Sequence, residues 1–573
     1  MLNQYTNAQL SIYAVLYNKI PENHMLKQIN EAVDFSFVNE LLAGSYCRNY
    51  GRPAKEPELM VRLLALQRLY NLSDKRVIEE ASLNLAYMYF LGINPEDELP
   101  HPSLLAKFRV HRLQDVTMDD ILTEIVKQCV DKGIVDDSQI SIDSTHSNAN
   151  TFQATVERVM KRFAHKIFKT MEKEMGKVPE SINQDIPNYK EIEDHKEAKK
   201  TMKEYLESTM EQVEKIIESE NLPETKAIMD NAREVLCDPK FMEQKGVRSL
   251  VDQEARVGHK SKTKRFFGYK TEFMMLTEAK LILAATVDHG AYVDGTRFER
   301  LLDLAQRSGL EIDEIYGDKA YFKKGILDQI TGIGAKPYIP VSPMAYRIDD
   351  ERFRYNKDSD EWFCEQGNST VKKAHKKSKN GRESFRYYFD RETCRDCPLR
   401  ETCITGKTVG KIMEVGINTP EFYQYSQEQK SEAFREKYKA RVGHEGKNGE
   451  MKQFHGLDRA LGYGLRSMSL QAKLTALAVN LKRIAKLVSS YFLEITLFLV
   501  NTSKKPHKKS ENQISSTIQE KGVQKSTPFS VVSTGPLSHD SDQSIFYIIL
   551  CIFIGFVKMA NNCFNHCIEW NGK

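Results

Sequence analysis

The sequence lacks three features that would narrow its function at once: a strong net charge, a disulfide framework and a long apolar run. Its 573 residues include 83 lysines and arginines against 79 aspartates and glutamates, a formal net charge of only +4. The overall charge therefore does not mark a nucleic-acid-binding protein, and any such surface must come from local clusters. The ten cysteines show no framework spacing, and Met1 to Ile20 has no basic start followed by an apolar core. We expect a reducing, cytoplasmic compartment.

The apolar content is modest and its runs are short. At 40% hydrophobic residues the chain can form ordinary cores, and its length leaves room for about two to four domains. Ile545–Val557 is apolar, but thirteen residues are too few to span a bilayer, so we expect no membrane partner. Residues 501–573 are rich in Ser, Lys, Gln and Pro and predict a disordered tail or read-through sequence beyond the functional end.

Two short apolar segments each lead to an aspartate. Ile140–Thr145 alternates apolar and polar residues up to Asp143, and a polar stretch follows, as at the C-terminal end of a strand. In the segment 312–321 an apolar run leads to Asp318, directly after a glycine. Such aspartates commonly cap the next helix, so neither motif is specific alone.

A third acidic motif lies far downstream, where four polar side chains recur at helical spacing. Tyr438, Arg441, Glu445 and Lys452 are separated by three, four and seven residues. At about 100° per residue they would fall within an arc of about 60° if the stretch is one α-helix. Gly443, Gly446 and Gly449 disfavour a helix around Glu445, so one alternative is a helix that begins late or orders only on DNA. One carboxylate framed by cations suits a site that holds a metal ion and a phosphodiester together. The alternative is a solvated face with an Arg441–Glu445 ion pair.

Taken together, the three motifs resemble the catalytic carboxylates of DDE transposases. The spacing from Tyr438 to Lys452 is similar to the Tyr-Arg-Glu-Lys signature of a large group of bacterial insertion-sequence transposases, and the resemblance spans about residues 20 to 490. It implies a ribonuclease-H-like α/β core, a mixed sheet flanked by helices, after an N-terminal all-α domain. It also implies that Asp143, Asp318 and Glu445 are catalytic and hold two Mg²⁺ or Mn²⁺ ions, whose preferred ligands are oxygens.

The same resemblance implies DNA as the partner. The protein would bind the terminal repeats of an insertion sequence as a homodimer, cut there by hydrolysis and join the 3′-hydroxyl ends to double-stranded target DNA, in association with the nucleoid. Arg441 and Lys452 would hold phosphates and Tyr438 would contact the DNA. Cations beside aromatic residues before a predicted strand, and one cation after Asp318, are further candidates for DNA contact: Lys260, Lys264, Arg265 and Lys319.

The pattern along the chain predicts three parts. Residues 1–135 read as helices with a basic third helix, which fits either a DNA-end-binding module or a plain helical bundle. Residues 136–500 would form the catalytic domain, with strands at Thr271–Leu276 and Leu281–Val287. Within it we expect a charged helical insertion at about 152–250, either solvated or a dimer contact, and a β-rich insertion at about 335–415.

The β-rich insertion contains four cysteines that could act together. Cys394, Cys397 and Cys403 lie close in sequence, and Cys364 lies thirty residues upstream of the first. Two readings remain open: one structural Zn²⁺ held by four thiolates, or four reduced cysteines without a metal.

Two functions other than transposition are compatible with the same residues. A ribonuclease-H-like nuclease or resolvase would use the carboxylates without strand transfer. A catalytically inactive DNA-binding regulator would retain them as relics, which the presence of all three disfavours.

Overall fold

The computed structural model describes residues 12–47, 53–151, 154–239, 241, 249, 251–261, 263–404 and 408–503, with side chains up to residue 490. The predicted tail lies outside the described residues from residue 504 onward. Within the described ranges, no helix is both long enough and apolar enough to cross a membrane.

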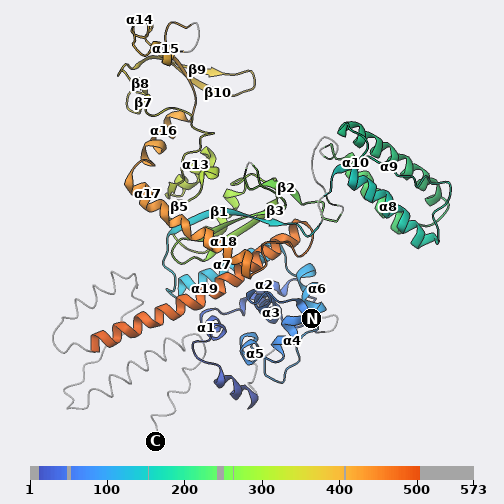
Figure 1. Ribbon diagram of the computed structural model, residues 1–573. Helices are drawn as coiled ribbons and strands as arrows, with labels where there is room; N and C mark the ends of the chain where they lie inside the picture. Colours follow the sequence, from blue (N-terminus) through green and yellow to red (C-terminus); the bar gives the residue numbers. More distant parts are fainter. Residues whose placement is uncertain are drawn as a thin grey trace, which may run out of the picture.

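A six-stranded mixed sheet lies at the centre of the molecule (Figure 1). The order is β2-β3-β1-β5-β6, and β4 pairs with β3 on the same edge as β2. Strand β1 is antiparallel to β3 and parallel to β5, which is parallel to β6. The predicted strands at 271–276 and 281–287 are confirmed as β3 and β4. The strands are β1 (Gln139–Asn148), β2 (Arg256–His259), β3 (Arg265–Leu276), β4 (Ile282–His289), β5 (Glu314–Tyr316) and β6 (Lys336–Tyr338).

Helices cover the sheet, and β3 and β4 are accordingly buried along nearly their whole length. Three helices pack on β4: α7 (Asp115–Asp131), α12 (Phe298–Gln306) and α19 (Gly464–Ser503). Asn480 of α19 fixes this packing, since its amide bonds both the N–H and the carbonyl of Ile282 at 2.8 Å.

The N-terminal helices do not have a core of their own. They share one continuous hydrophobic cluster with the sheet and with α19, which α1 and α3 both contact. Arg109, on the predicted basic third helix, forms a two-pronged ion pair with Asp74 and so is engaged within the protein. These elements are η1 (Ile12–Lys19), α1 (Met25–Ala32), α2 (Phe37–Ala43), α3 (Pro57–Leu69), α4 (Asp74–Ala81), α5 (Leu85–Leu91) and α6 (Ser103–His111).

The charged helical segment forms a separate three-helix bundle that projects to one side of the sheet (Figure 1). Its helices are α8 (Val156–Met175), α9 (His195–Ile217) and α10 (Pro223–Cys237). Its apolar side chains form a second hydrophobic cluster, in which Met160, Met202 and Leu206 are fully buried. The bundle is therefore stabilised by its own core and not only by exposed ion pairs.

The β-rich segment lies at the far end of the molecule, beyond α16 (Figure 1). It contains a two-stranded and a three-stranded antiparallel sheet around the buried side chains of Trp362 and Tyr387. The elements are β7 (Phe353–Asn356), β8 (Glu361–Cys364), β9 (Thr370–Lys377), β10 (Glu383–Phe389), α14 (Arg391–Arg395), α15 (Arg400–Cys403) and β11 (Ile412–Gly416).

The remaining elements connect these parts to the sheet and lead towards α19. After β5 come η2 (Lys319–Tyr321) and α13 (Lys324–Gly332). After β11 the chain returns through α16 (Thr419–Glu428), α17 (Glu432–Tyr438), η3 (Lys439–Val442) and α18 (Gly443–Phe454).

A buried charge cluster should set much of the stability of the shared core. The Lys473 ammonium group is 1% exposed and lies 2.6 Å from Asp119, whose side chain is 3% exposed. Removing one partner of a buried pair is strongly destabilising, so Lys473→Met should lower the free energy of unfolding by about 3 kcal/mol, although Arg300 still pairs with Asp119 at 2.9 Å. Urea denaturation measures the change.

The matched control is Lys75→Met, which removes an exposed pair with Glu79. Surface pairs contribute at most about 1 kcal/mol, so this variant should unfold nearly as the parent does. Equal losses in the two variants would show that the buried cluster has no special importance.

Candidate active site

Asp143 lies in the middle of β1, opposite Phe273 of β3. The prediction of a strand is confirmed, but the predicted strand end is wrong, because β1 continues to Asn148. The polar residues that suggested a loop keep pairing in register with β3, and the Ser147 hydroxyl donates to the carbonyl of Leu457 at 2.6 Å. Asp143 is therefore held by regular sheet pairing on a rigid element.

Asp318 follows the short strand β5, as predicted, and lies beside β1 because β5 and β1 are parallel neighbours. One of its carboxylate oxygens accepts the N–H of Ala320 at 2.8 Å and caps η2. The preceding Gly317 allows the close approach to β1, since a Cβ there would lie 3.2 Å from the Ile142 side chain.

Two side chains from the α17–α18 region hold the Asp143 carboxylate. Arg441 Nη2 lies 3.2 Å from Oδ1, and Asn448 Nδ2 donates to Oδ2 at 3.3 Å. Burial raises the pKa of Asp143, the charge of Arg441 opposes that shift, and the charge of Asp318 adds to it. Asp318 is therefore close enough to influence the ionisation of Asp143.

The predicted continuous helix from Tyr438 to Lys452 is interrupted. Tyr438 ends α17, Arg441 lies in the 3-10 turn η3, and α18 begins only at Gly443. The predicted 60° arc therefore does not apply across the whole stretch. Glu445 is exposed in the first turn of α18, and within the described part of the chain it has no hydrogen bond or ion pair. The glycines explain the late start, since each disfavours a helix.

Two residues hold α18 in place, and our sequence analysis did not single them out. His444 is 1% exposed, and its Nδ1 lies 2.8 Å from the hydroxyl of Ser141 on β1. Asn448 makes the contact to Asp143 described above. His444, Asn448 and Met451 recur at intervals of four and three, a helical spacing that could have revealed the strand-facing side of α18.

The far end of β1 gathers positive charge. Lys452 Nζ lies 3.4 Å from Nδ1 of His146. Burial, together with the charges of Lys452 and Lys260, lowers the pKa of His146 to about 4. The structure thus brings Lys260 and Lys452 together, whereas Lys264, Arg265 and Lys319 are exposed on the β2–β3 hairpin and on η2.

Tyr438 belongs to an aromatic stack. Its ring lies 5.8 Å from that of Phe434, which contacts Tyr338, and Tyr338 stacks on Tyr316 of β5. Burial raises the pKa of the Tyr438 phenol. This stack fixes the end of α17 to the edge of the sheet and so fixes the start of the turn that carries Arg441.

The four cysteines considered as possible Zn²⁺ ligands lie close together in the folded β-rich segment. The four cysteines line one small cavity of about 30 Å³. Across the described ranges, however, no three His, Cys, Asp or Glu side chains are arranged to hold a metal ion. Three of the thiols instead pack as apolar groups against the main core: Cys364, Cys394 and Cys403. Within the same described ranges the three carboxylates are not arranged to hold a metal ion either, because Glu445 does not lie with Asp143 and Asp318.

Comparison with protein-family models gives two matches. Residues 14–111 match a transposase domain (DUF772), and residues 363–485 match a transposase DDE domain. The chain is a DDE-type transposase. The DDE match contains Arg441, Glu445 and Lys452, whereas Asp143 and Asp318 lie before it.

Other comparisons add little to this assignment. No curated protein matches the transposase chain. A solved structure of the piggyBac transposase synaptic complex with hairpin DNA aligns over 94% of this chain and 90% of that one, at 10% identity and a TM-score of 0.26. At that score the two structures superpose too poorly to support any assignment.

The buried His444 should make the stability of the transposase depend on pH. Burial lowers its pKa from 6.5 to about 3, so between these values the unfolded chain binds a proton that the folded chain does not. Its contribution to stability is complete above pH 6.5 and is lost as pH falls towards 3, by up to about 1.4 kcal/mol per pH unit.

In His444→Asn, the unfolding free energy should therefore fall less steeply below pH 6.5 than in the parent. His146 and His455 also have lowered pKa values, so some pH dependence remains in both proteins. Urea denaturation across the range measures the difference. Parallel curves below pH 6.5 would contradict the assignment.

Proposed function

We propose that this transposase is a bacterial insertion-sequence enzyme with a ribonuclease-H-like catalytic core. The strand arrangement supports the fold: β4, β3 and β1 are successive antiparallel neighbours, and β5 and β6 follow in parallel on the other side of β1. The observation that carries the proposal is that Asp143 on β1 lies beside Asp318, which follows β5. The helix that carries Glu445 packs over this position.

These three carboxylates are proposed to hold divalent ions, Mg²⁺ or Mn²⁺, when DNA is bound. Their oxygens are the ligands that such ions prefer. The ions would supply charge stabilisation at the phosphate and an activated oxygen nucleophile. Asp143 and Asp318 fit this role as they stand, because Asp143 lies on β1, Asp318 follows the parallel neighbour β5, and Asp143 already attracts the cationic Arg441.

Glu445 joins the pair when the DNA binds. It lies on α18 about 60° around the axis from Asn448, which contacts Asp143, and about 20° from Lys452. It therefore flanks the side of α18 that faces β1. A rotation at the η3–α18 junction, where Gly443 begins the helix, would turn its carboxylate towards Asp143.

The reaction follows from this arrangement. Water attacks the phosphodiester at the element end and releases a 3′-hydroxyl, which then attacks target DNA. Arg441 and Lys452 provide positive charge on either side of Asp143, where phosphates of the cleaved strand would lie. No covalent protein–DNA intermediate is needed, and the hydrolysis and the strand transfer use the same carboxylates.

The carboxylate variants Asp143→Asn, Asp318→Asn and Glu445→Gln test the proposal. Each should reduce Mg²⁺-dependent cleavage of DNA from the borders of the coding region by at least about 100-fold, since even outer-shell partners of a metal contribute 10–100-fold. Binding of the same DNA should change only a few-fold, because no cation is lost. Gel analysis of cleavage and fluorescence anisotropy measure the two effects.

Glu436→Gln is the matched control for Glu445→Gln. Glu436 is also exposed and nearby, but its side chain pairs only with Lys439 on the surface. The Glu436→Gln variant should cleave DNA as the parent protein does. DNA with pre-cut ends tests strand transfer separately from cutting. A protein that cuts the DNA but does not join pre-cut ends to a target would be a nuclease and not a transposase. Normal cleavage by Glu445→Gln would overturn the proposed site.

A further inference from the structure

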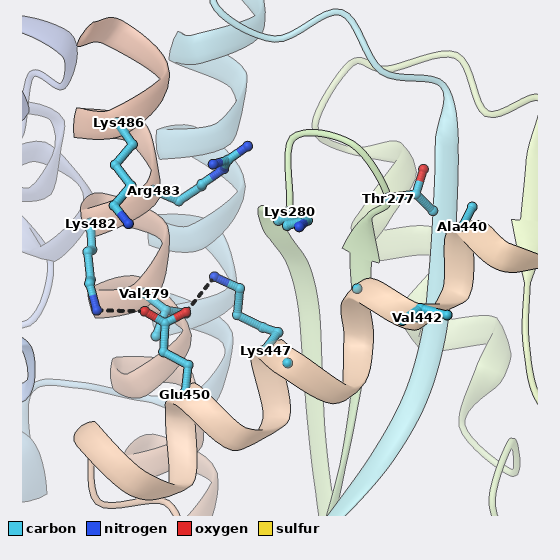
Figure 2. A pocket seen from close by; sticks show the side chains of 12 residues that line it. Thr277, Lys280, Ala440, Val442, Lys447, Glu450, Val479, Lys482, Arg483 and Lys486 are labelled. Carbon is cyan, nitrogen blue, oxygen red and sulfur yellow. Dashed lines mark hydrogen bonds and ion pairs between the residues drawn. The ribbon is translucent and has the colours of Figure 1, made fainter. Parts of the chain in front are cut away.

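The side of α18 that faces away from Asp143 borders a large basic groove. The groove has a volume of about 610 Å³ and is formed by three elements: the β3–β4 turn, the η3–α18 segment and α19. Figure 2 shows long cationic side chains converging on it from the turn, from α18 and from α19. Five cations and a single carboxylate line it: Lys280, Lys447, Lys482, Arg483, Lys486 and Glu450.

The carboxylate does not neutralise the groove. Glu450 forms ion pairs with Lys447 at 3.0 Å and with Lys482 at 2.8 Å (Figure 2). Although burial opposes its ionisation, these two lysines lower the pKa of Glu450 to about 2, so its one negative charge is shared between two cations. The groove therefore keeps a clear excess of positive charge at neutral pH.

The other three cations are not paired with acids. Arg483 Nε donates to the carbonyl of Ala279 at 2.8 Å, which fixes its guanidinium group without neutralising it. Lys280 and Lys486 are exposed, and within the described part of the chain neither side chain has a hydrogen-bond or ion-pair partner. Unpaired cations at the mouth of a groove favour a ligand that carries several negative charges.

The backbone at Lys280 is held in an unfavourable conformation. Its φ is 56°, in the left-handed region, which costs a non-glycine residue roughly 1 kcal/mol or more. The turn is anchored because Asp137 accepts the N–H groups of Glu278 and Ala279 at 2.8 and 3.1 Å. A lysine is thus kept over the groove at a position where glycine would be less strained.

The floor of the groove is open because α18 has no side chain there. A Cβ at Gly446 would have no atom within 4 Å, and one at Gly443 would meet only the Lys280 side chain, at 3.5 Å, and the Thr277 carbonyl. A ligand can therefore approach the helix backbone closely. Each of these glycines weakens the helix by roughly 0.5–1 kcal/mol relative to alanine.

The groove is distinct from the site at Asp143. On α18, Gly443, Gly446 and Glu450 fall within an arc of about 60°, and Asn448 lies nearly opposite the centre of that arc. A helix with its side chains is about 10 Å across, so a phosphate in the groove cannot be the one cleaved at Asp143. At 3.4 Å of duplex axis per phosphate of one strand, that distance corresponds to roughly three phosphates.

We infer that this groove binds the sugar–phosphate backbone of duplex DNA, without reading sequence, at phosphates away from the cleaved one. The inference rests on the proposed function, since it extends the DNA path of the same enzyme around the far side of α18. It assigns Lys280 and Lys486 as phosphate contacts, a role that their lack of protein partners and the strained turn support.

The test uses the full chain and a labelled 40-base-pair duplex of random sequence. In the double variant Lys280→Gln/Lys486→Gln, the plot of log affinity against log salt should be shallower than in the parent by about 1.8, or about 0.9 for each lost phosphate contact. Neither side chain has a partner to lose, so folding should be unaffected. The matched control is Lys166→Gln/Lys169→Gln, which removes two exposed lysines from α8. Its slope should equal that of the parent.

Acetylation of lysines, read by mass spectrometry, gives a second measurement on the unaltered protein. DNA should protect Lys280 and Lys486 from acetylation at least several-fold, and leave Lys166 and Lys169 unprotected. A parental slope in the groove variant, or equal loss in the control variant, would overturn the inference, as would acetylation of Lys280 and Lys486 that is unchanged by DNA. None of these outcomes depends on cleavage, so a failure of the proposed chemistry would be seen separately in the carboxylate variants.

Discussion

The contact between α18 and β1 is the interaction on which the rest of the site depends. Three polar contacts join the two elements along their length: Ser141 with His444, Asp143 with Asn448, and His146 with Lys452. Because Ser141 and Asp143 lie on a strand paired on both sides, the sheet fixes one partner of each contact. The position of Glu445 relative to the aspartates is therefore set by how α18 sits on this strand.

The position of α18 depends in turn on the shared core. At its end, His455 is buried and its Nδ1 lies 2.8 Å from the Arg68 carbonyl of α3. On the side of α18 that faces away from β1, Lys482 of α19 forms an ion pair with Glu450. Helix α19 itself is attached to β4 through Asn480 and to α7 through the buried Lys473. The N-terminal helices and α19 thus form the support against which the catalytic elements are placed.

Much of the site could be predicted from local sequence, because local sequence determines strands and caps. Asp318 follows a short apolar run and caps the next turn, as its pattern indicated. The sequence could not show that β1 continues beyond Asp143, because polar residues 144–148 are kept in the strand by pairing with β3, a segment more than a hundred residues away. Long-range pairing outweighed local composition there.

For the helix that carries Glu445, local spacing predicted more regular structure than the fold contains. Spacing from Tyr438 to Lys452 predicted one helix, but the aromatic stack on β5 and β6 holds Tyr438 while α18 is held by β1, and a 3-10 turn accommodates the difference. His444 was missed because a single histidine among glycines and charges carries no signal without the strand that it contacts. The four cysteines line one cavity, as their spacing suggested, and three of them, Cys364, Cys394 and Cys403, also pack on the main core.

The most direct test of the central claim is to map the metal site by local oxidative cleavage of the polypeptide. Fe²⁺ replaces Mg²⁺ in the DNA complex, and with ascorbate and peroxide it cuts the backbone next to the bound ion; mass spectrometry sizes the fragments. The account predicts cuts near residues 143, 318 and 445 together, all lost in Asp143→Asn. Cuts at 143 and 318 without one near 445, or cuts that persist in Asp143→Asn, would contradict the proposal that the three carboxylates form one metal site.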